Sequence, residues 1–159
     1  MADLYEATRE NVQLAVLDGL VARVVDKVAG PTSVVNVTVP GGALPLHCTG
    51  VGKVILAFSD PQLLPRLVSQ GLERHTRYTL VEPGRLASNI QQVRQTNLGW
   101  STEERTLGAC SIAAPLFGQA SEFRGALAIV ARSTVDLKRL ASAVRLAALS
   151  ASRLLAAHD

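Results

Sequence analysis

Aromatic side chains, cysteines and charged residues are all scarce in this sequence. Aromatic residues make up 4% of the 159 residues, charged residues make up 18%, and there are 2 cysteines. Because Cys48 and Cys110 are far apart, they do not form the disulfide framework of a small secreted domain, and we interpret them as reduced thiols. The hydrophobic fraction of 48% excludes a disordered chain and predicts one domain with a substantial core.

Long apolar runs and a strong net charge are also missing. The Ala/Leu-rich C-terminal region is interrupted by Arg139, Arg145 and Arg153, so no apolar run approaches the length that spans a bilayer. The first residues lack the basic start and apolar run of a secretion signal. The net charge of +3 is mild and the basic residues are scattered, which gives little support for direct nucleic-acid contact. We therefore expect a cytoplasmic protein with no membrane partner.

The sequence does contain a strong hairpin signal. Two apolar runs, Cys110–Phe117 and Gly125–Ala131, flank a short polar break at Gly118–Glu122. Both faces of each run are largely apolar, so we expect this hairpin at the centre of a sheet that is covered on both sides. The other strands that we predict are Val12–Leu17, Leu20–Ala29 after an Asp18-Gly19 turn, Ser33–Val39 and Trp100–Arg105.

Helical spacing and capping residues predict the remaining elements. The expected helices are Leu4–Asn11, a helix from Thr49 to Phe58, Gln62–Gln70, Pro83–Asn97 and Asp136–His158. Leu137, Leu140, Val144, Ala147, Ala151 and Leu154 are the expected buried stripe of the last helix. The strands are joined by hairpins and the βαβ rhythm is missing. This order predicts the α+β class, with an antiparallel sheet of about six strands and flanking helices.

The start of the helix after Thr49 is a candidate anion site. The first backbone amides of a helix have no internal partner, and the helix dipole adds partial positive charge there. Gly50 would allow a ligand carboxylate to approach its amide closely. The ordinary alternative is that Gly50 and Gly52 only allow tight packing of this helix on the sheet.

We identify no catalytic set, no metal site and no cofactor motif, and we expect a protein that is not an enzyme. His47 and Cys48 are neighbours in a segment that we take as extended, so their side chains point to opposite sides and do not form a nucleophile–base pair. His75 and His158 are isolated in polar settings, which argues against a metal site. Lys53 follows a Gly-rich stretch without the Walker spacing.

Four segments carry a family resemblance. They are Leu44–Phe58 (LPLHCTGVGKVILAF), Gly99–Glu104 (GWSTEE), Gly108–Pro115 (GACSIAAP) and Gly125–Ser133 (GALAIVARS), in this order. The set resembles the C-terminal effector-binding domain of IclR-type bacterial transcription regulators, and the resemblance extends from Leu4 to His158. It implies a GAF- or profilin-like fold with a cavity on one side of the sheet.

The resemblance also implies an organisation and partners. Residues 1–159 correspond to a single effector-binding domain, and the N-terminal winged helix-turn-helix domain of family members is absent from this chain. DNA would be bound only through that missing domain. The resemblance further implies a small organic acid as effector and self-association into dimers or tetramers.

The effector-site positions of the family can be transferred one at a time. The amides of Gly50 and Val51 would hold the anionic end of the ligand, while Leu46 and Leu56 would form apolar walls. The expected cavity-facing strand positions are Ser101, Ala109, Ser111, Ala128 and Val130. Ala128 and Val130 stand where many members have serines, so we expect a more apolar cavity. The predicted ligand has a carboxylate end and a sizeable apolar body, such as an aromatic acid.

Two functions remain open at the level of sequence. The first is a ligand sensor whose occupancy shifts the quaternary arrangement of a DNA-bound regulator, which requires different ligand affinities in two arrangements. The second is an oligomerisation module with a vestigial cavity, which the loss of the two serine hydroxyls favours.

Overall fold

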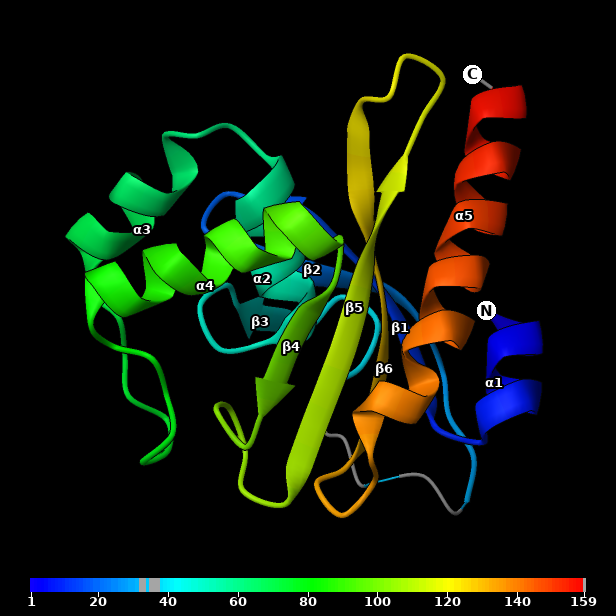
Figure 1. Cartoon of the computed structure of the whole chain (residues 1–159), viewed down its shortest axis with the longest axis horizontal. Helices are drawn as coiled ribbons and strands as arrows, with labels where there is room; N and C mark the ends of the chain where they lie inside the picture. Colours follow the sequence, from blue (N-terminus) through cyan, green and yellow to red (C-terminus); the bar gives the residue numbers. More distant parts are fainter. Residues whose placement is uncertain (32–33, 35–37, 159) are drawn as a thin grey trace.

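The computed structural model describes residues 1–31, 34 and 38–158. The elements follow the chain in the order α1 (Ala2–Thr8), β1 (Asn11–Asp18), β2 (Val21–Val28), β3 (Ala43–Pro45), α2 (Gly50–Phe58), α3 (Leu63–Gln70), α4 (Pro83–Thr96), β4 (Gly99–Thr102), β5 (Ala109–Phe117), β6 (Phe123–Arg132), the 3-10 helix η1 (Leu137–Leu140) and α5 (Ala141–His158). Figure 1 shows how these elements lie around one sheet.

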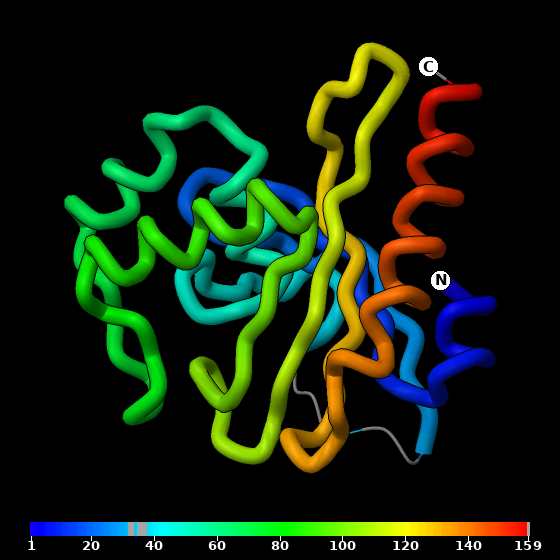
Figure 2. Tube along the Cα trace, in the orientation of Figure 1, coloured from blue at the N-terminus to red at the C-terminus, as the bar shows by residue number. Residues whose placement is uncertain are grey.

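The sheet has six strands in the order β3-β2-β1-β6-β5-β4 within the described residues, and each neighbouring pair is antiparallel. Helices α2, α3 and α4 lie on one side of it, while α1 and α5 lie on the other (Figure 1). Both ends of the chain lie on the α5 side (Figure 2). The predicted α+β class with a six-stranded antiparallel sheet is therefore confirmed.

The central hairpin separates two hydrophobic cores. β6 pairs with both β1 and β5, which places it inside the sheet. On β5, Ala113 packs into the core under α2 and α4, whereas Ile112 and Ala114 pack into the core under α5. This alternation follows from the period of two along a strand. The prediction that both faces of the hairpin are covered is confirmed.

The third strand differs from the sequence prediction. Of the predicted strand Ser33–Val39, residues 33 and 35–37 lie outside the described residues, and Val39 is not in a strand. The third described strand is β3, which pairs with β2 from Val21 to Arg23. The chain reaches it through Gly41, whose φ of 90° allows a turn in which its amide bonds the Val24 carbonyl at 2.7 Å.

Two further turns end strands earlier or later than predicted. The first hairpin closes through Gly19 and Leu20, because Asp18 still pairs with Val21. Gly19 has a φ of 64°, as the first loop position of a type II′ turn requires. β4 ends at Thr102 rather than Arg105, because Glu103 takes a left-handed φ of 55° and turns the chain.

The predicted caps Thr49 and Asp136 are confirmed. The first helix was predicted wrongly, because α1 runs from Ala2 to Thr8 and Asn11 already begins β1. The buried stripe of α5 also differs from the prediction. The Thr49 hydroxyl accepts a hydrogen bond from the Gly52 amide at 3.0 Å, and Asp136 accepts one from the Lys138 amide at 3.1 Å. Leu154, a predicted core residue, is exposed, and Leu155 packs towards the core instead. At about 3.6 residues per turn, Leu155 lies about three full turns after the buried Val144 and faces the same side of the helix. Leu154 falls short of that position and faces outwards.

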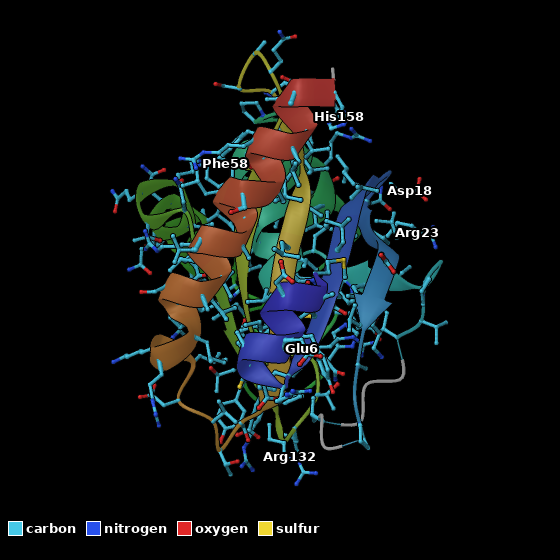
Figure 3. The ribbon with its side chains drawn as sticks, turned by 90° about the vertical axis from the view of Figure 1, so that its right-hand side faces the viewer. Glu6, Asp18, Arg23, Phe58, Arg132 and His158 are labelled. Atoms are coloured by element: carbon cyan, nitrogen blue, oxygen red, sulfur yellow. The ribbon has the colours of Figure 1, made fainter. Side chains whose placement is uncertain are left out.

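The outer face of α5 is unusually apolar. Leu137–His158 is long and apolar enough to cross a membrane by length and composition, with a mean hydropathy of 1.4, although its arginines interrupt every apolar run. Length and composition alone are weak support for a membrane span. In this structure α5 packs on the sheet through Val144 and Ala148, and 11% of its apolar window is buried. Figure 3 views the molecule from this side, with α5 and α1 lying over the sheet and His158 at the end of α5. Leu146 and Leu149 are exposed on this helix.

Candidate functional site

The start of α2 is fixed by side chains from two directions. The Thr49 hydroxyl donates to the Pro45 carbonyl at 2.7 Å while it caps the helix. The Ser101 hydroxyl of β4 donates to the Cys48 carbonyl at 2.8 Å, within the buried interior. The helix start is therefore attached both to the chain that precedes it and to the edge of the sheet.

Both glycines of α2 are closely packed against their neighbours. A Cβ atom at Gly50 would lie 2.9 Å from Ser111 Oγ and 3.3 Å from the Gly99 carbonyl oxygen. A Cβ atom at Gly52 would lie 2.4 Å from both Cα and the carbonyl oxygen of Leu46. A larger residue at either position would fit only if the neighbouring atoms moved. Both glycines therefore let α2 approach its surroundings closely.

The first amides of α2 are not all available to a ligand. The Gly50 amide donates to Ser111 Oγ at 3.1 Å, and the Gly52 amide is used by the Thr49 cap. The Lys53 amide bonds the Thr49 carbonyl at 3.0 Å. Among the described residues we find no hydrogen-bond partner for the amide of Val51.

A cavity of about 150 Å³ lies beside this helix start. It is bounded by residues of β1, β3, β4, β5 and β6, by the chain before α2 and by the loop between β4 and β5. Its lining residues are Gln13, Thr38, Leu44, Cys48, Thr49, Ser101, Arg105, Thr106, Ala109, Cys110, Ser111 and Val130. Among these described residues Arg105 alone carries a charge.

The structure brings part of the predicted site together. Ser101, Ala109, Ser111 and Val130 line the cavity from β4, β5 and β6. Ser111 on β5 pairs with Val130 on β6 and with Ser101 on β4, so the three residues form one row across the sheet. Gly50 and Val51 do not line the cavity, although the Gly50 amide reaches its Ser111 hydroxyl.

Three predicted residues lie in the core instead of at the cavity. Leu56 is buried on α2, about two turns or 10 Å along the helix from its start. Ala128 lies on the same face of β6 as Val130, two residues earlier in the strand, and it packs in the core shared with α2. Leu46 is fully buried in that core, where its backbone packs against Gly52.

Sequence reasoning missed Arg105 and Gln13. Arg105 was placed in a strand, whereas the left-handed Glu103 puts it in the β4–β5 loop at the cavity. The Thr76 and Thr79 hydroxyls hold this loop by donating to the carbonyls of the two residues before Arg105, at 2.6 Å and 2.7 Å. Gln13 is a buried polar residue within the otherwise apolar run Val12–Leu17 of β1, and that contrast was a usable signal.

Histidines and cysteines near the cavity are closer together than predicted. The prediction that His75 is isolated is wrong, because its ring centroid lies 5.8 Å from that of His47. Burial, followed by the Arg105 guanidinium, lowers the pKa of His75. Cys48 and Cys110 are free and buried, and burial raises the pKa of the Cys48 thiol to about 12 and that of Cys110 to about 11. Neither thiol is poised as a nucleophile.

The fold and the cavity together define a small-molecule-binding domain, with a small space of mixed polarity beside a helix start. Over residues 1–153 the sequence matches the family described as "Bacterial transcriptional regulator IclR C-terminal". The chain therefore belongs to the IclR family and corresponds to its effector-binding domain.

Individual relatives agree with this assignment. The transcriptional repressor IclR of Escherichia coli (strain K12) is 34% identical over 143 residues, which cover 86% of this chain and 52% of the relative. A crystal structure of an IclR-type regulator from Silicibacter sp. TM1040 aligns with a TM-score of 0.89 at 28% identity, covering 97% of this chain and 63% of that one. The chain spans about half the length of the curated relatives that it matches.

A third relative was solved with a ligand. It is a double mutant of the inducer-binding domain of the PobR transcription factor from Acinetobacter, in complex with 3-hydroxybenzoic acid. It aligns with a TM-score of 0.83 at 27% identity, covering 94% of this chain and 91% of that one.

Proposed function

We propose that this domain senses a small organic acid, and that a single-ring aromatic acid is the best-fitting class. The observation that carries the proposal is the combination of Arg105 and the Ser111 hydroxyl in one small cavity whose other walls include Val130, Ala109 and Leu44. A guanidinium and a hydroxyl suit a carboxylate, while the apolar walls suit a ring.

The volume of the cavity limits the size of the ligand. About 150 Å³ is the volume of engineered protein cavities that bind benzene. A single ring would fill this space and leave its carboxylate at the Arg105 side. The complex of the PobR inducer-binding domain with 3-hydroxybenzoic acid supports the same class of ligand, since that relative is 27% identical to this chain.

In this proposal the start of α2 acts on the ligand through Ser111. The Ser111 hydroxyl accepts a hydrogen bond from the Gly50 amide, so its own proton is available for donation into the cavity. Hydrogen bonds in such a chain polarise one another, which strengthens the contact with an anion. The amides of Gly50 and Val51 add the partial positive charge of the helix start.

Calorimetric titration tests the proposed ligand class. We expect saturable binding of benzoate or 3-hydroxybenzoate, weaker binding of glyoxylate, and weaker binding of benzyl alcohol, which has the ring without the charge. Tighter binding of glyoxylate than of the aromatic acids, or no saturable binding of any acid, would contradict the proposal.

Variants locate the site. Removing a charged hydrogen-bond partner costs about 1.5–3 kcal/mol, and Arg105 is solvent-exposed, so we expect Arg105→Gln to weaken benzoate binding about tenfold. Arg77→Gln is the matched control, because Arg77 is also exposed but stacks on Tyr78 outside the cavity. Equal losses in the two variants would mean that the effect is one of net charge.

We further propose that occupancy is transmitted to DNA through the arrangement of subunits, with DNA bound in the cytoplasm by a further domain of the whole regulator. A ligand can shift such an arrangement only by its difference in affinity for two states. In a titration followed by light scattering, benzoate is expected to change the distribution of oligomers. An unchanged distribution at saturation would contradict this route.

The alternative function is an oligomerisation module with a vestigial cavity. The exposed Leu146, Leu149 and Leu154 of α5 favour it, because exposed leucines on one helix suit a protein interface. Substitution Leu149→Glu is expected to lower the mass measured by light scattering, whereas Leu17→Glu on β1 leaves it unchanged. If Leu149→Glu lowers the measured mass and no acid binds, the domain is an oligomerisation module and not a ligand sensor.

A further inference from the structure

Three metal-binding side chains meet beside the cavity. His47 and Cys48 come from the chain just before α2, and His75 comes from the connection between α3 and α4. One potential ligand atom from each residue lies within 4.8 Å of the other two. His47 and Cys48 are buried, and the side chain of His75 is 15% exposed.

The backbone before α2 explains why the sequence did not reveal this cluster. Adjacent side chains diverge in an extended segment, but residues 46–49 form successive bends. The bent backbone allows both neighbours to contribute an atom to one cluster. The prediction that the His47 and Cys48 side chains point to opposite sides rested on an extended segment and is therefore wrong.

The protonation of His47 is set by a neighbouring carbonyl. His47 Nε2 lies 2.8 Å from the carbonyl oxygen of Glu73, which can only accept a hydrogen bond. The proton is therefore on Nε2, and Nδ1 keeps its lone pair. A histidine that donates one ring N–H to a carbonyl while the other nitrogen stays free has the orientation of a metal ligand.

The Nδ1 lone pair of His75 is engaged by Arg105. Nδ1 lies 3.3 Å from the guanidinium, which can only donate, so a metal ion would bind this nitrogen only by displacing Arg105. Glu73 faces His75 from the other side, with a carboxylate oxygen 3.9 Å from Nε2. Two imidazoles and one thiol are a ligand set that suits Zn²⁺ with a fourth, open position.

We propose that His47, Cys48 and His75 bind a Zn²⁺ ion, with water completing a tetrahedral site on the side of the cavity that Cys48 lines. With metal–ligand bonds of about 2.0–2.3 Å, neighbouring ligand atoms lie about 3.3–3.7 Å apart, so atoms that are now up to 4.8 Å apart must approach by up to about 1.5 Å. His75 comes from a loop and its side chain is 15% exposed, so it is the residue that would supply that movement. The thiol proton is released as the thiolate–zinc bond forms. The zinc proposal does not rest on the proposed effector, although Cys48 lines the effector cavity and Arg105 contacts His75.

Cobalt substitution tests the site directly. The untagged chain is stripped with a chelator and titrated with Co²⁺, whose spectrum reports both thiolate ligation and tetrahedral geometry. We expect a stoichiometric thiolate-to-cobalt charge-transfer band that Zn²⁺ abolishes by displacement. Absence of that band in the unmodified chain would overturn the proposal.

Matched variants identify the ligands. Cys48→Ser should remove the charge-transfer band and His75→Ala should weaken Co²⁺ binding about tenfold or more, while Cys110→Ser and His158→Ala keep both. If Cys48→Ser does not fold, His75→Ala decides, since the His75 side chain is less buried than that of Cys48. A band that survives in both ligand variants reflects adventitious metal and overturns the assignment. Arg105→Gln should tighten Co²⁺ binding, because it removes a positive charge beside His75.

Discussion

The buried ion pair between Lys53 and Glu104 gives the sharpest prediction of stability. Lys53 Nζ lies 2.8 Å from Glu104 Oε2 and 2.8 Å from the Trp100 carbonyl oxygen, and the two side chains are 1% and 12% exposed. Substitution Glu104→Gln removes the negative charge and leaves the Lys53 ammonium buried without a counter-ion. Breaking a buried pair in this way costs about 3–5 kcal/mol of unfolding free energy.

Thermal unfolding and urea titration measure this loss. In a protein of this length about 1 kcal/mol lowers Tm by about 2–4 °C, so Glu104→Gln should lower Tm by about 6–20 °C. The loss should depend only weakly on salt, because a buried pair is poorly screened.

Two further variants separate the buried charge from other causes. The double substitution Lys53→Met with Glu104→Leu removes both charges, and it should recover much of the loss. Glu6→Gln breaks the exposed Glu6–Arg9 pair, whose side chains are each 62% exposed, and it should cost at most about 1 kcal/mol. If Glu104→Gln is no more destabilising than Glu6→Gln, the reasoning about the buried ammonium is refuted.

Four other predictions concern the start of α2 and the Cys48 thiol. Gly52→Ala should lower the free energy of unfolding, measured by urea titration, by about 1–3 kcal/mol, and by more than Gly50→Ala does. The Cβ at position 52 meets backbone atoms of Leu46, whereas the Cβ at position 50 first meets a hydroxyl. The reverse order would contradict the packing account. Thr49→Ala should cost about 1 kcal/mol through loss of the cap, and an unchanged urea midpoint would exclude that role. Cys48, with a pKa of about 12, should react with iodoacetamide at pH 8 at least about a hundredfold more slowly than in the urea-unfolded chain. Above about pH 9 the unfolded thiol loses its proton first, so the unfolding free energy should fall as pH rises; a rise would refute the shift.

The sequence was sufficient for elements whose signal is local. The alternation in β5 and β6, the Thr49 cap and the Asp136 cap were all read correctly, because side-chain period and capping chemistry act within a few residues. β3 was not predicted, since a strand of 3 residues has too little pattern and exists only through its pairing with β2. Leu154 was assigned to the wrong side of α5 because a small error in phase accumulates along a helix.

The candidate site was predictable where it lies on strands and not where it lies on loops. Ser101, Ser111 and Val130 followed from strand alternation and the family resemblance, and they line the cavity. Arg105 depends on the left-handed backbone of Glu103, a rare conformation for that residue. The approach of His75 to His47 depends on how two loops pack, which no local pattern encodes.

The contacts around the α2 start also indicate how occupancy of the cavity could move the protein, which we offer as a hypothesis. The approach of Gly50 to Ser111 leaves no room for α2 to move closer to β5. The β4–β5 loop has more room to move, since Arg105 is exposed. Hydroxyls of Thr76 and Thr79 tie this loop to the segment before α4, so the two would move together. A ligand that draws Arg105 inward would therefore move this connection rather than the sheet. Hydrogen exchange with and without benzoate checks this: added protection confined to the amides of residues 76–79 and 103–108 supports it, and protection only within β5 and β6 would exclude it.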